Sequence, residues 1–461
     1  MALFDLGEIT RICRGRLVAG QPEVAVTSVV TDSRQAAPGS LFVCLPGERV
    51  DGHEFAGAAG EQGAVAALAQ RELAAPGTMG VVMVPDTRQA LWDLAVAYRS
   101  RFAPRTIAIT GSVGKTTTKD IVASILSARF CVLKNEGNLN TEIGLPLTIF
   151  RLRPEHQVAV VELAMRGLGQ IAQLAELARP EVGIVTNVGE AHLELLGSIE
   201  NIARAKGELV MALPREGLAV LNGDDPRVRA MAIGAAPSVI TYGLSENNDV
   251  QGTPLDRKNG HTRFWVRSTG QLLGQAERVL SSPIPGRHNL SNTLAAVAVA
   301  RWLGMDWEGI QTGLHQYQGS AMRLVIADHN GVTIIDDSYN ASPASVRAAL
   351  HTLADEAGTR RRVAILGDML ELGERENELH YQLGPAIVAA GVSLLVAVGP
   401  RSRHTATGAE AAGLAGRICW VSDNQQALEV AREFLAAGDV VLVKGSRGMK
   451  MEEIVTALRE E

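Results

Sequence analysis

The chain has 461 residues, so at about 100–200 residues per domain it has room for two to four domains. Its composition, 46% hydrophobic and 20% charged, is typical of a globular protein, and the net charge of −6 argues against nucleic acid as a partner. No run of about 18 apolar residues and no signal-like apolar segment occur, so we expect neither a membrane span nor export. The four cysteines are scattered without C-x-x-C spacing, which favours reduced thiols in a cytoplasmic protein.

Residues 1–85 are expected to form a small α/β domain, with strands near 28–31, 41–45 and 81–84 and a helix near 54–62. Two polar loops, TDSRQAAPGS and PGERVDGHEF, follow the first and second of these strands. They can line a cleft for a polar ligand, but two solvated turns explain the same composition. The polar groups concerned are Asp32, Ser33, Arg34, Arg49, Asp51 and His53.

Residues 86–104 predict a helix that connects this domain to the next. Asp86 or Thr87 can cap its start, and Pro104 marks its end because proline cannot continue a helix. Apolar residues recur at helical spacing along one face, namely Leu91, Leu94, Ala95 and Tyr98.

The stretch TIAITGSVGKTTTK at 106–119 predicts a buried strand, a glycine turn and a helix that begins near Lys115. In this context backbone N–H groups and the helix dipole bind phosphate, the lysine meets the outer phosphates, and the hydroxyl of Thr116 binds Mg²⁺. Ile109 occupies the position of the first glycine in the G-x₄-G-K-[ST] pattern, so a glycine turn with a solvated lysine is the alternative. The expected phosphate-binding residues are Gly111, Ser112, Val113, Gly114, Lys115, Thr116 and Thr117.

Strands and helices alternate from 105 to 318, interrupted at 245–282 by a segment that predicts antiparallel hairpins. Glu162 ends one expected strand and His192 follows the next, at the edge where open parallel sheets bind ligands. A metal ion is one explanation for these residues, whereas a lone histidine also serves as a structural hydrogen-bonding group.

Three further polar residues of this region lie on predicted helices. Spacing alone makes Lys206 an exposed helical lysine. Asn289 and Asn292 lie one turn apart on a helix face, where their amides suit an adenine edge, although Asn289 also suits a helix N-cap.

The region 319–461 predicts a second doubly wound α/β sheet, with helices at 344–354, 376–390, 425–437 and 452–459. Because no G-x-G-x-x-G follows its first strand, a nicotinamide site is not expected. The segments IIDDSYN and KGSRGMK place polar groups at the ends of two strands. Among them, Arg447 can bind a carboxylate in bidentate fashion. The others are Asp336, Asp337, Tyr339, Asn340, Lys444 and Ser446.

Nine motifs follow one another along nearly the whole chain: TGSVGKTT, NLNTEIGLP, ELAMRGLGQI, TNVGEAHLELLGS, AKGE, PGRHNLSN, DDSYNASP, LGDMLELG and VLVKGSRGMKME. In this order they resemble the Mur ligase family, and LGDMLELGE resembles its dipeptide-adding member. The resemblance implies three α/β domains: a small domain at 1–85 that binds a UDP-sugar, a central P-loop ATPase-like domain at 105–318, and a dinucleotide-binding-like domain at 319–461 that binds the dipeptide.

The resemblance also implies the reaction. The carboxylate of UDP-MurNAc-tripeptide attacks the γ-phosphate of ATP, and D-alanyl-D-alanine then attacks the acyl phosphate, as part of peptidoglycan precursor synthesis. A monomeric, cytoplasmic, Mg²⁺-dependent ligase is expected. The third residue of the tripeptide, lysine or diaminopimelate, does not follow from the motifs.

Site roles are carried over from the family by matching its motifs. The catalytic residues are Lys115, Glu162, His192 and Lys206. The metal-binding residues are Thr116, Glu162, His192 and Lys206, with Lys206 carbamylated. The ATP contacts beyond the phosphate loop are Asn289, Asn292, Arg323 and Asp337. The UDP-sugar contacts are Ser33, Arg34, Gly47, Asp51 and His53, and the dipeptide contacts are Asn340, Ser446 and Arg447. One departure follows Glu162, where the chain reads LAMRGLGQ and some members read LGANxxGE.

Two other functions remain as alternatives. A sister ligase that adds a diamino acid or glutamate shares this build. The diamino-acid enzyme carries an Asp-Asn-Pro-Arg type loop in its last domain, and this loop is absent from the sequence. A nucleotide-gated switch protein needs no second or third substrate pocket, so the DSR, LPGERVDG and KGSR loops argue against it.

Overall fold

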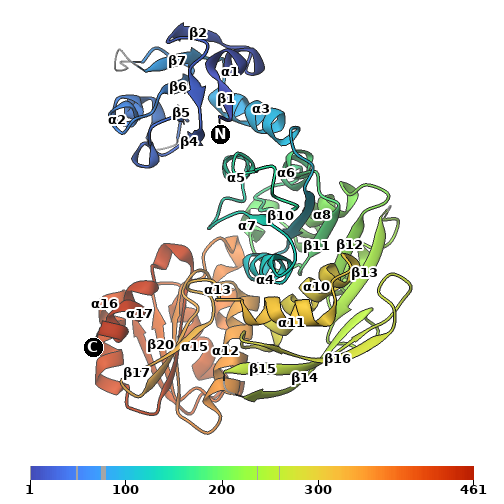
Figure 1. Ribbon diagram of the computed structural model, residues 1–461. Helices are drawn as coiled ribbons and strands as arrows, with labels where there is room; N and C mark the ends of the chain where they lie inside the picture. The colour runs from blue at the N-terminus through green and yellow to red at the C-terminus, as the bar shows by residue number, and fades with distance from the viewer. Residues whose placement is uncertain (1, 48–49, 74–78, 236, 259, 461) are drawn as a thin grey trace. The chain divides into compact units, whose positions relative to one another are not determined.

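The computed structural model describes residues 2–47, 50–73, 79–235, 237–258 and 260–460 (Figure 1). The chain divides into two compact units, and the division passes through strand β8 (Arg105–Thr110). The first unit consists of Met1–Ala108, Phe130–Ala164 and Ala172–Pro180, and the second of Ile109–Arg129, Met165–Ile171 and Glu181–Glu461. Within the described ranges, no helix is long and apolar enough to span a membrane.

The N-terminal part of the first unit contains a five-stranded sheet in the order β2-β7-β6-β5-β4, parallel except for the β2–β7 pair. Its strands are β2 (Arg16–Ala19), β4 (Ser28–Val30), β5 (Ser40–Val43), β6 (Ala66–Ala69) and β7 (Gly80–Met83), and β1 (Phe4–Asp5) pairs separately with β3 (Ala25–Val26). Its helices are α1 (Leu6–Ile12), η1 (Ser33–Gln35), η2 (Gly52–Phe55) and α2 (Ala56–Glu61). Strand β6 is absent from the prediction because its sequence, AALA, favours a helix, and pairing with β5 and β7 overrides that preference.

The connecting helix is α3 (Thr87–Arg99), and Asp86 caps it by accepting hydrogen bonds from the backbone N–H groups of Arg88 and Gln89. Tyr98 on its apolar face is fully buried, and its hydroxyl donates to the carbonyl of Leu152. The predicted helix is therefore confirmed in this segment.

A nine-stranded sheet has the order β16-β15-β14-β13-β12-β11-β8-β10-β9. The predicted hairpins are confirmed, because β14, β15 and β16 form an antiparallel meander. The sheet's strands besides β8 are β9 (Val132–Lys134), β10 (Val158–Glu162), β11 (Val182–Val185), β12 (Leu218–Asn222), β13 (Ser238–Gly243), β14 (Val250–Lys258), β15 (His261–Ser268) and β16 (Ala276–Ser282). The helices of this region are α4 (Lys115–Ser127), α5 (Gly144–Ile149), α6 (Gln170–Ala178), α7 (Leu193–Leu196), α8 (Ile199–Met211), α9 (Pro226–Ala230), α10 (Arg287–Trp302) and α11 (Trp307–His315).

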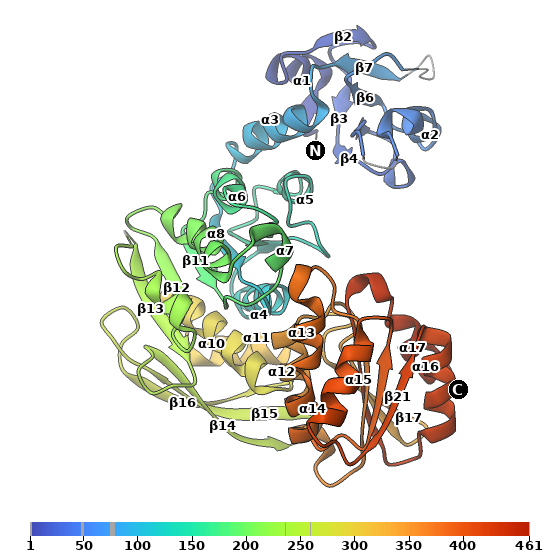
Figure 2. The ribbon, with the colours of Figure 1, turned by 180° about the vertical axis from the view of Figure 1, so that it is seen from behind.

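The last region contains a six-stranded sheet in the order β17-β18-β22-β19-β20-β21, parallel except for its edge strand β17. Its strands are β17 (Val325–His329), β18 (Val332–Asp336), β19 (Arg362–Gly367), β20 (Leu394–Val398), β21 (Arg417–Val421) and β22 (Val440–Lys444). Its helices are α12 (Pro343–Ala357), η3 (Gly373–Arg375), α13 (Glu376–Tyr381), α14 (Gly384–Ala389), α15 (Ser402–Ala411), α16 (Asn424–Phe434), η4 (Arg447–Met449) and α17 (Glu452–Glu460) (Figure 2).

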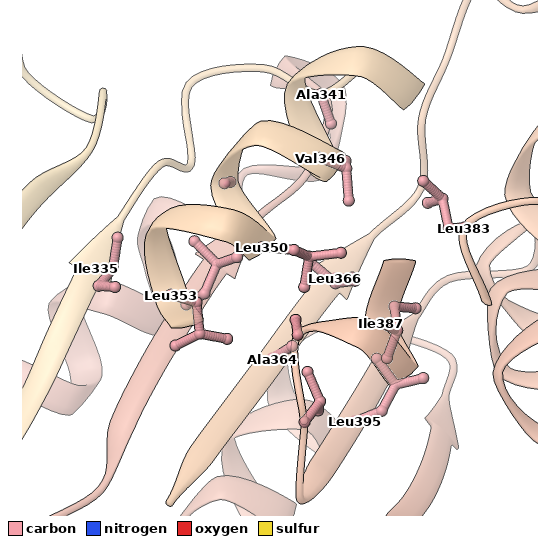
Figure 3. Close-up of a cluster of buried hydrophobic side chains, with 14 of the residues drawn as sticks. Ile335, Ala341, Val346, Leu350, Leu353, Ala364, Leu366, Leu383, Ile387 and Leu395 are labelled. Carbon is pink, nitrogen blue, oxygen red and sulfur yellow. The ribbon is translucent and has the colours of Figure 1, made fainter. Parts of the chain in front are cut away.

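Two hydrophobic clusters cover the two faces of this sheet. On one face, Leu350 and Leu353 of α12 pack with Leu366 of β19 and with residues of α14 (Figure 3). On the other face, Ala427 of α16 and Ile454 of α17 pack against the strands. Helices on both faces of a mainly parallel sheet define the doubly wound arrangement, so the predicted α/β fold class is confirmed.

One predicted helix of this region is interrupted in the structure. The single helix expected at 376–390 is two helices, α13 and α14, separated at Gln382 and Leu383. Pro385 lies in the first turn of α14, because proline has no N–H group to continue the preceding helix and its ring clashes with the preceding turn.

Candidate active site

The phosphate loop joins β8 to α4 through two glycines in conformations that side chains disfavour. Gly111 has φ 151° and Gly114, the N-cap of α4, has φ 85°. A Cβ atom at Gly111 would lie 1.8 Å from Oγ1 of Thr186, and one at Gly114 would lie 2.8 Å from Oδ1 of Asn292. Glycine is therefore required at both positions by neighbouring side chains as well as by the backbone.

The loop that follows β11 holds the phosphate loop in place. Asn187 accepts a hydrogen bond from the Val113 N–H and donates one to the Val113 carbonyl, each at 2.9 Å. The Thr186 hydroxyl donates to the same carbonyl at 2.7 Å. Ser112 exchanges hydrogen bonds with the backbone of Gly189, so its hydroxyl supports the loop. Thr186 and Asn187 were not predicted as site residues, although the TNVG motif after a strand carries the signal.

The Lys115 ammonium turns back over the loop and donates to the carbonyl of Gly111 at 2.8 Å. Asn292 lies against Gly114 and donates to Oδ1 of Asn289, and Asn289 donates to the Pro285 carbonyl. Because the N-cap of α10 is Gly286, the N-cap alternative for Asn289 is wrong. The two predicted adenine-contacting residues thus lie beside the phosphate loop.

His192 and Lys206 lie within the electrostatic field of Lys115. Burial lowers the pKa of His192, and Lys115 lowers it further, while the carboxylate of Glu371 opposes the change. The imidazole Nδ1 lies 2.8 Å from Oε2 of Glu371. Lys206 is only 2% exposed on α8, and burial, followed by the charge of Lys115, holds its pKa well below the ordinary value. The alternative of an exposed helical lysine is therefore wrong.

Glu162 ends β10 in the first unit and is buried. Its Oε1 accepts a hydrogen bond from Nδ2 of Asn140 at 2.7 Å, and its backbone N–H donates to Asn135. The phosphate-loop threonines begin α4 in the second unit, and Thr117 is buried while Thr116 is partly exposed.

Polar residues of the last region gather after β18 and β22. Asp337 forms a 2.5 Å ion pair with the buried Lys444, which also donates to the carbonyl of Asn340. Ser446 is buried; it accepts a hydrogen bond from the Leu370 N–H and donates to a backbone carbonyl. It therefore braces loops around the predicted dipeptide position, while the side chain of Asn340 is exposed.

The two predicted arginines of this region, Arg323 and Arg447, share one aromatic neighbour. Their guanidinium carbons lie 4.0 Å and 5.8 Å from the ring centre of Tyr339. Arg447 also donates to Glu452 at 2.7 Å.

The residues predicted to bind the UDP-sugar occupy two turns of the first unit. Arg34 binds Asp32 in bidentate fashion, and Ser33 begins the turn of η1 that Asp32 caps. Hydrogen bonds from His53, and then from Arg71, hold the pKa of Asp51 well below its ordinary range.

The His53 ring is buried and both of its nitrogens are engaged. Nδ1 lies 2.5 Å from Asp51, and Nε2 accepts from the backbone of Gln70. His53 therefore holds this loop together. In the same loop, the backbone N–H of Gly47 donates to the carbonyl of Val50. Arg49 lies outside the described residues.

Three models of one family match the chain in sequence order. They are the Mur ligase family catalytic domain at 25–99, the Mur ligase middle domain at 109–300, and the Mur ligase, glutamate ligase domain at 322–447. UDP-N-acetylmuramoyl-tripeptide–D-alanyl-D-alanine ligase of Bacillus subtilis (strain 168) is 36% identical over 98% of this chain and 97% of the relative. The Escherichia coli (strain K12) protein of the same name is 37% identical over 100% and 99%.

Solved structures agree with these relatives. The structure of MurF from Acinetobacter baumannii has a TM-score of 0.89 at 31% identity and covers 99% of both chains. The MurF ligase from Thermotoga maritima, solved in complex with ADP, has a TM-score of 0.82 at 28% identity over 94% of this chain and 97% of that one. With a matching model for each region and full-length relatives above 30% identity, the chain belongs to the Mur ligase family.

Proposed function

We propose that the chain is an ATP-dependent ligase that joins D-alanyl-D-alanine to UDP-MurNAc-tripeptide in peptidoglycan precursor synthesis. The observation that carries this proposal is full-length similarity to ligases of that name, in a chain whose phosphate loop is braced beside Lys115, Asn292 and Lys206. The uridine nucleotide is assigned to 1–85, ATP to 105–318 and the dipeptide to 319–461. We also propose that the protein is a monomer and acts in the cytoplasm.

The proposed reaction has two steps. An oxygen of the tripeptide carboxylate attacks the γ-phosphorus of ATP, and ADP leaves with the electron pair of the broken P–O bond. The amine of D-alanyl-D-alanine then attacks the acyl carbon, inorganic phosphate leaves, and the amine loses a proton. Because an ionised carboxylate has no good leaving group, phosphorylation is what makes amide formation accessible.

The residues of the chain supply positioning and positive charge. Lys115 and the loop N–H groups are assigned to the β- and γ-phosphates, where they stabilise charge that develops on the transferred group. Asn289 and Asn292 are assigned to adenine, Asp337 to ribose and Arg323 to phosphate. The incoming dipeptide is assigned to Asn340 and Arg447, and Ser446 to the loop that presents them.

Mg²⁺ would neutralise phosphate charge, and it prefers oxygen ligands. Across the described ranges, no group of three His, Cys, Asp or Glu side chains that could hold a metal is found. Thr116, Glu162 and His192 offer one hydroxyl, one carboxylate and one imidazole. We propose that a carbamate on Lys206 adds the missing carboxylate, since a lysine amine reacts with carbon dioxide only when neutral and burial favours that form.

Product analysis tests the proposed function. The protein is incubated with ATP, D-alanyl-D-alanine and either the lysine or the diaminopimelate UDP-tripeptide, and products are identified by mass spectrometry. We expect the UDP-pentapeptide, ADP and phosphate, with appreciable ATP hydrolysis only when both organic substrates are present. Addition of a single diamino acid or glutamate would instead indicate a sister ligase.

The phosphate-loop assignment is tested in the same assay. Lys115→Ala should reduce turnover by roughly 10³-fold or more, because it removes charge from the transferring phosphoryl group. The thermal melting curve should match that of the wild type. Near wild-type turnover in the folded variant would contradict the role of Lys115.

A further inference from the structure

The ring of Tyr339 has two guanidinium groups close to it. The Arg323 carbon is 4.0 Å from the ring centre and the Arg447 carbon is 5.8 Å away. Both distances fall within the range of about 6 Å in which a cation is attracted to the face of an aromatic ring. One half-buried side chain thus contacts two cations.

The three residues come from separate segments that the fold brings together. Arg323 precedes β17, Tyr339 follows β18, and Arg447 follows β22. Two further contacts connect these segments through Met322. The Tyr339 backbone N–H donates to the Met322 carbonyl at 3.1 Å, and Nη1 of Arg447 lies 3.8 Å from the Met322 sulfur.

The backbone around Arg323 is strained. Met322 has φ 59° and Leu324 has φ 52°, so both neighbours of Arg323 occupy the left-handed region that non-glycine residues disfavour. Such conformations persist only where surrounding contacts hold them, and they concentrate at functional sites. The contacts of Tyr339 with Met322 and Arg323 supply that support.

The two arginines differ in their charge partners. Arg447 is paired with Glu452, and the nearby carboxylate of Asp337 is paired with Lys444. Among the residues that the structure describes, no hydrogen bond or ion pair from the Arg323 guanidinium to another side chain is found. Its donors are therefore available to an anion while the group stays in contact with the ring.

We propose that Tyr339 is a positioning residue that presents Arg323 and Arg447 to two different anions. This inference rests on the proposed function, which assigns Arg323 to phosphate and Arg447 to the dipeptide carboxylate. Because both cations use one ring, loss of the ring should weaken the recognition of both substrates. Loss of the hydroxyl alone should have little effect.

Two substitutions separate the ring from the hydroxyl. Tyr339→Leu should raise the Kd of a non-hydrolysable ATP analogue and the KM of D-alanyl-D-alanine, each by about threefold to tenfold, as expected for a cation–π contact. Tyr339→Phe should leave both values within about twofold of the wild type. In an Arg323→Ala background, Tyr339→Leu should still raise the KM of the dipeptide but should no longer change nucleotide affinity.

Phe434→Leu is the matched control. Arg417 lies 3.9 Å from the Phe434 ring centre in the same region, so this change removes an aromatic ring from a cation–π pair without affecting the predicted site. It should change neither constant.

A folded Tyr339→Leu variant with wild-type nucleotide and dipeptide constants would overturn the proposal, and so would a Tyr339→Phe variant as weak as the leucine variant. Nucleotide binding is measured without turnover. A wild type that binds the ATP analogue but makes no UDP-pentapeptide would therefore refute the proposed function separately.

Discussion

Lys206 illustrates how a residue's surroundings can reverse what its sequence context indicates. In the sequence it is one lysine of a polar helix, yet in the structure it is buried and lies near a second cation, Lys115. Such a site disfavours an ammonium group and favours a neutral amine, which is the form that a carbamate requires. Helix α8 packs against α7, α9 and β11. The spacing of residues around Lys206 does not show that this packing covers its side chain, so the sequence alone gives no sign of the burial.

We expect Lys206→Ala to lose most ligation activity and to regain part of it when short carboxylates are added, because these can occupy the vacated space. Lys206→Arg should remain inactive, since a guanidinium keeps its positive charge and cannot be carbamylated. Initial rates of UDP-pentapeptide formation measure both effects. Lys119→Ala is the control, because Lys119 is an equally buried lysine on α4, and carboxylates should not rescue its loss. A fully active Lys206→Arg variant would show that no carbamate is involved.

At the scale of elements, the sequence predicts best where a pattern is local. The strand, glycine turn and helix around Gly111 to Lys115 follow from adjacent residues, and the structure has them as β8, the loop and α4. Strand β6 and helix α15 are missed, since AALA favours a helix and SRHTATGAEA is a poor helix sequence. Pairing with neighbouring strands and packing on the sheet determine these elements, and neither is visible in a short window.

The site residues, too, can be predicted only as far as local spacing determines their positions. Asn289 and Asn292 can be placed on one helix face from their spacing, but only the folded chain shows Asn292 against Gly114. Glu371 could not be predicted, because its contact with His192 joins segments that are far apart in the sequence.

Helix α10 carries a histidine that gives the fold a predictable pH dependence. Burial, followed by the charges of Lys444 and His351, lowers the pKa of His288 to about 4. In the unfolded chain a histidine titrates near pH 6.5. Between these values the unfolded state binds more protons, so the free energy of unfolding falls as the pH falls from about 6.5 to about 4.

The expected contribution of His288 to this fall is at most about 3 kcal/mol, given 1.36 kcal/mol per pKa unit. Urea unfolding at pH 7 and pH 4.5 measures it. His288→Gln should unfold with a shallower pH dependence than the wild type, because glutamine does not titrate. His315→Gln, which changes an exposed histidine on α11, should keep the wild-type dependence. Equal pH dependence in all three proteins would contradict the role of His288.

At the scale of the molecule, the middle and last regions of the second unit meet at a contact between a histidine and a carboxylate. His192 and Glu371 form the contact, and both residues have left-handed backbones, with φ 62° each. Nearby, a Cβ atom at Gly373 would lie 3.2 Å from the backbone of Glu194, so η3 approaches α7 closely. The proposed reaction uses Lys115 from the middle region and Arg323 from the last, so it requires the two regions to be held together.

Glu371→Gln removes the charge of this contact and preserves the size of the side chain. Without ligands, we expect faster backbone hydrogen exchange on both sides of the contact, in α7 and in η3, because the substitution weakens the interaction between the two regions. The ATP analogue with UDP-MurNAc-tripeptide should restore protection on both sides, since the ligands replace the lost attraction by binding both regions. Glu374→Gln, which alters an exposed neighbour, should change neither segment. Faster exchange confined to η3 would show only a local effect of the substitution, and the His192–Glu371 pair would then have no part in holding the two regions together.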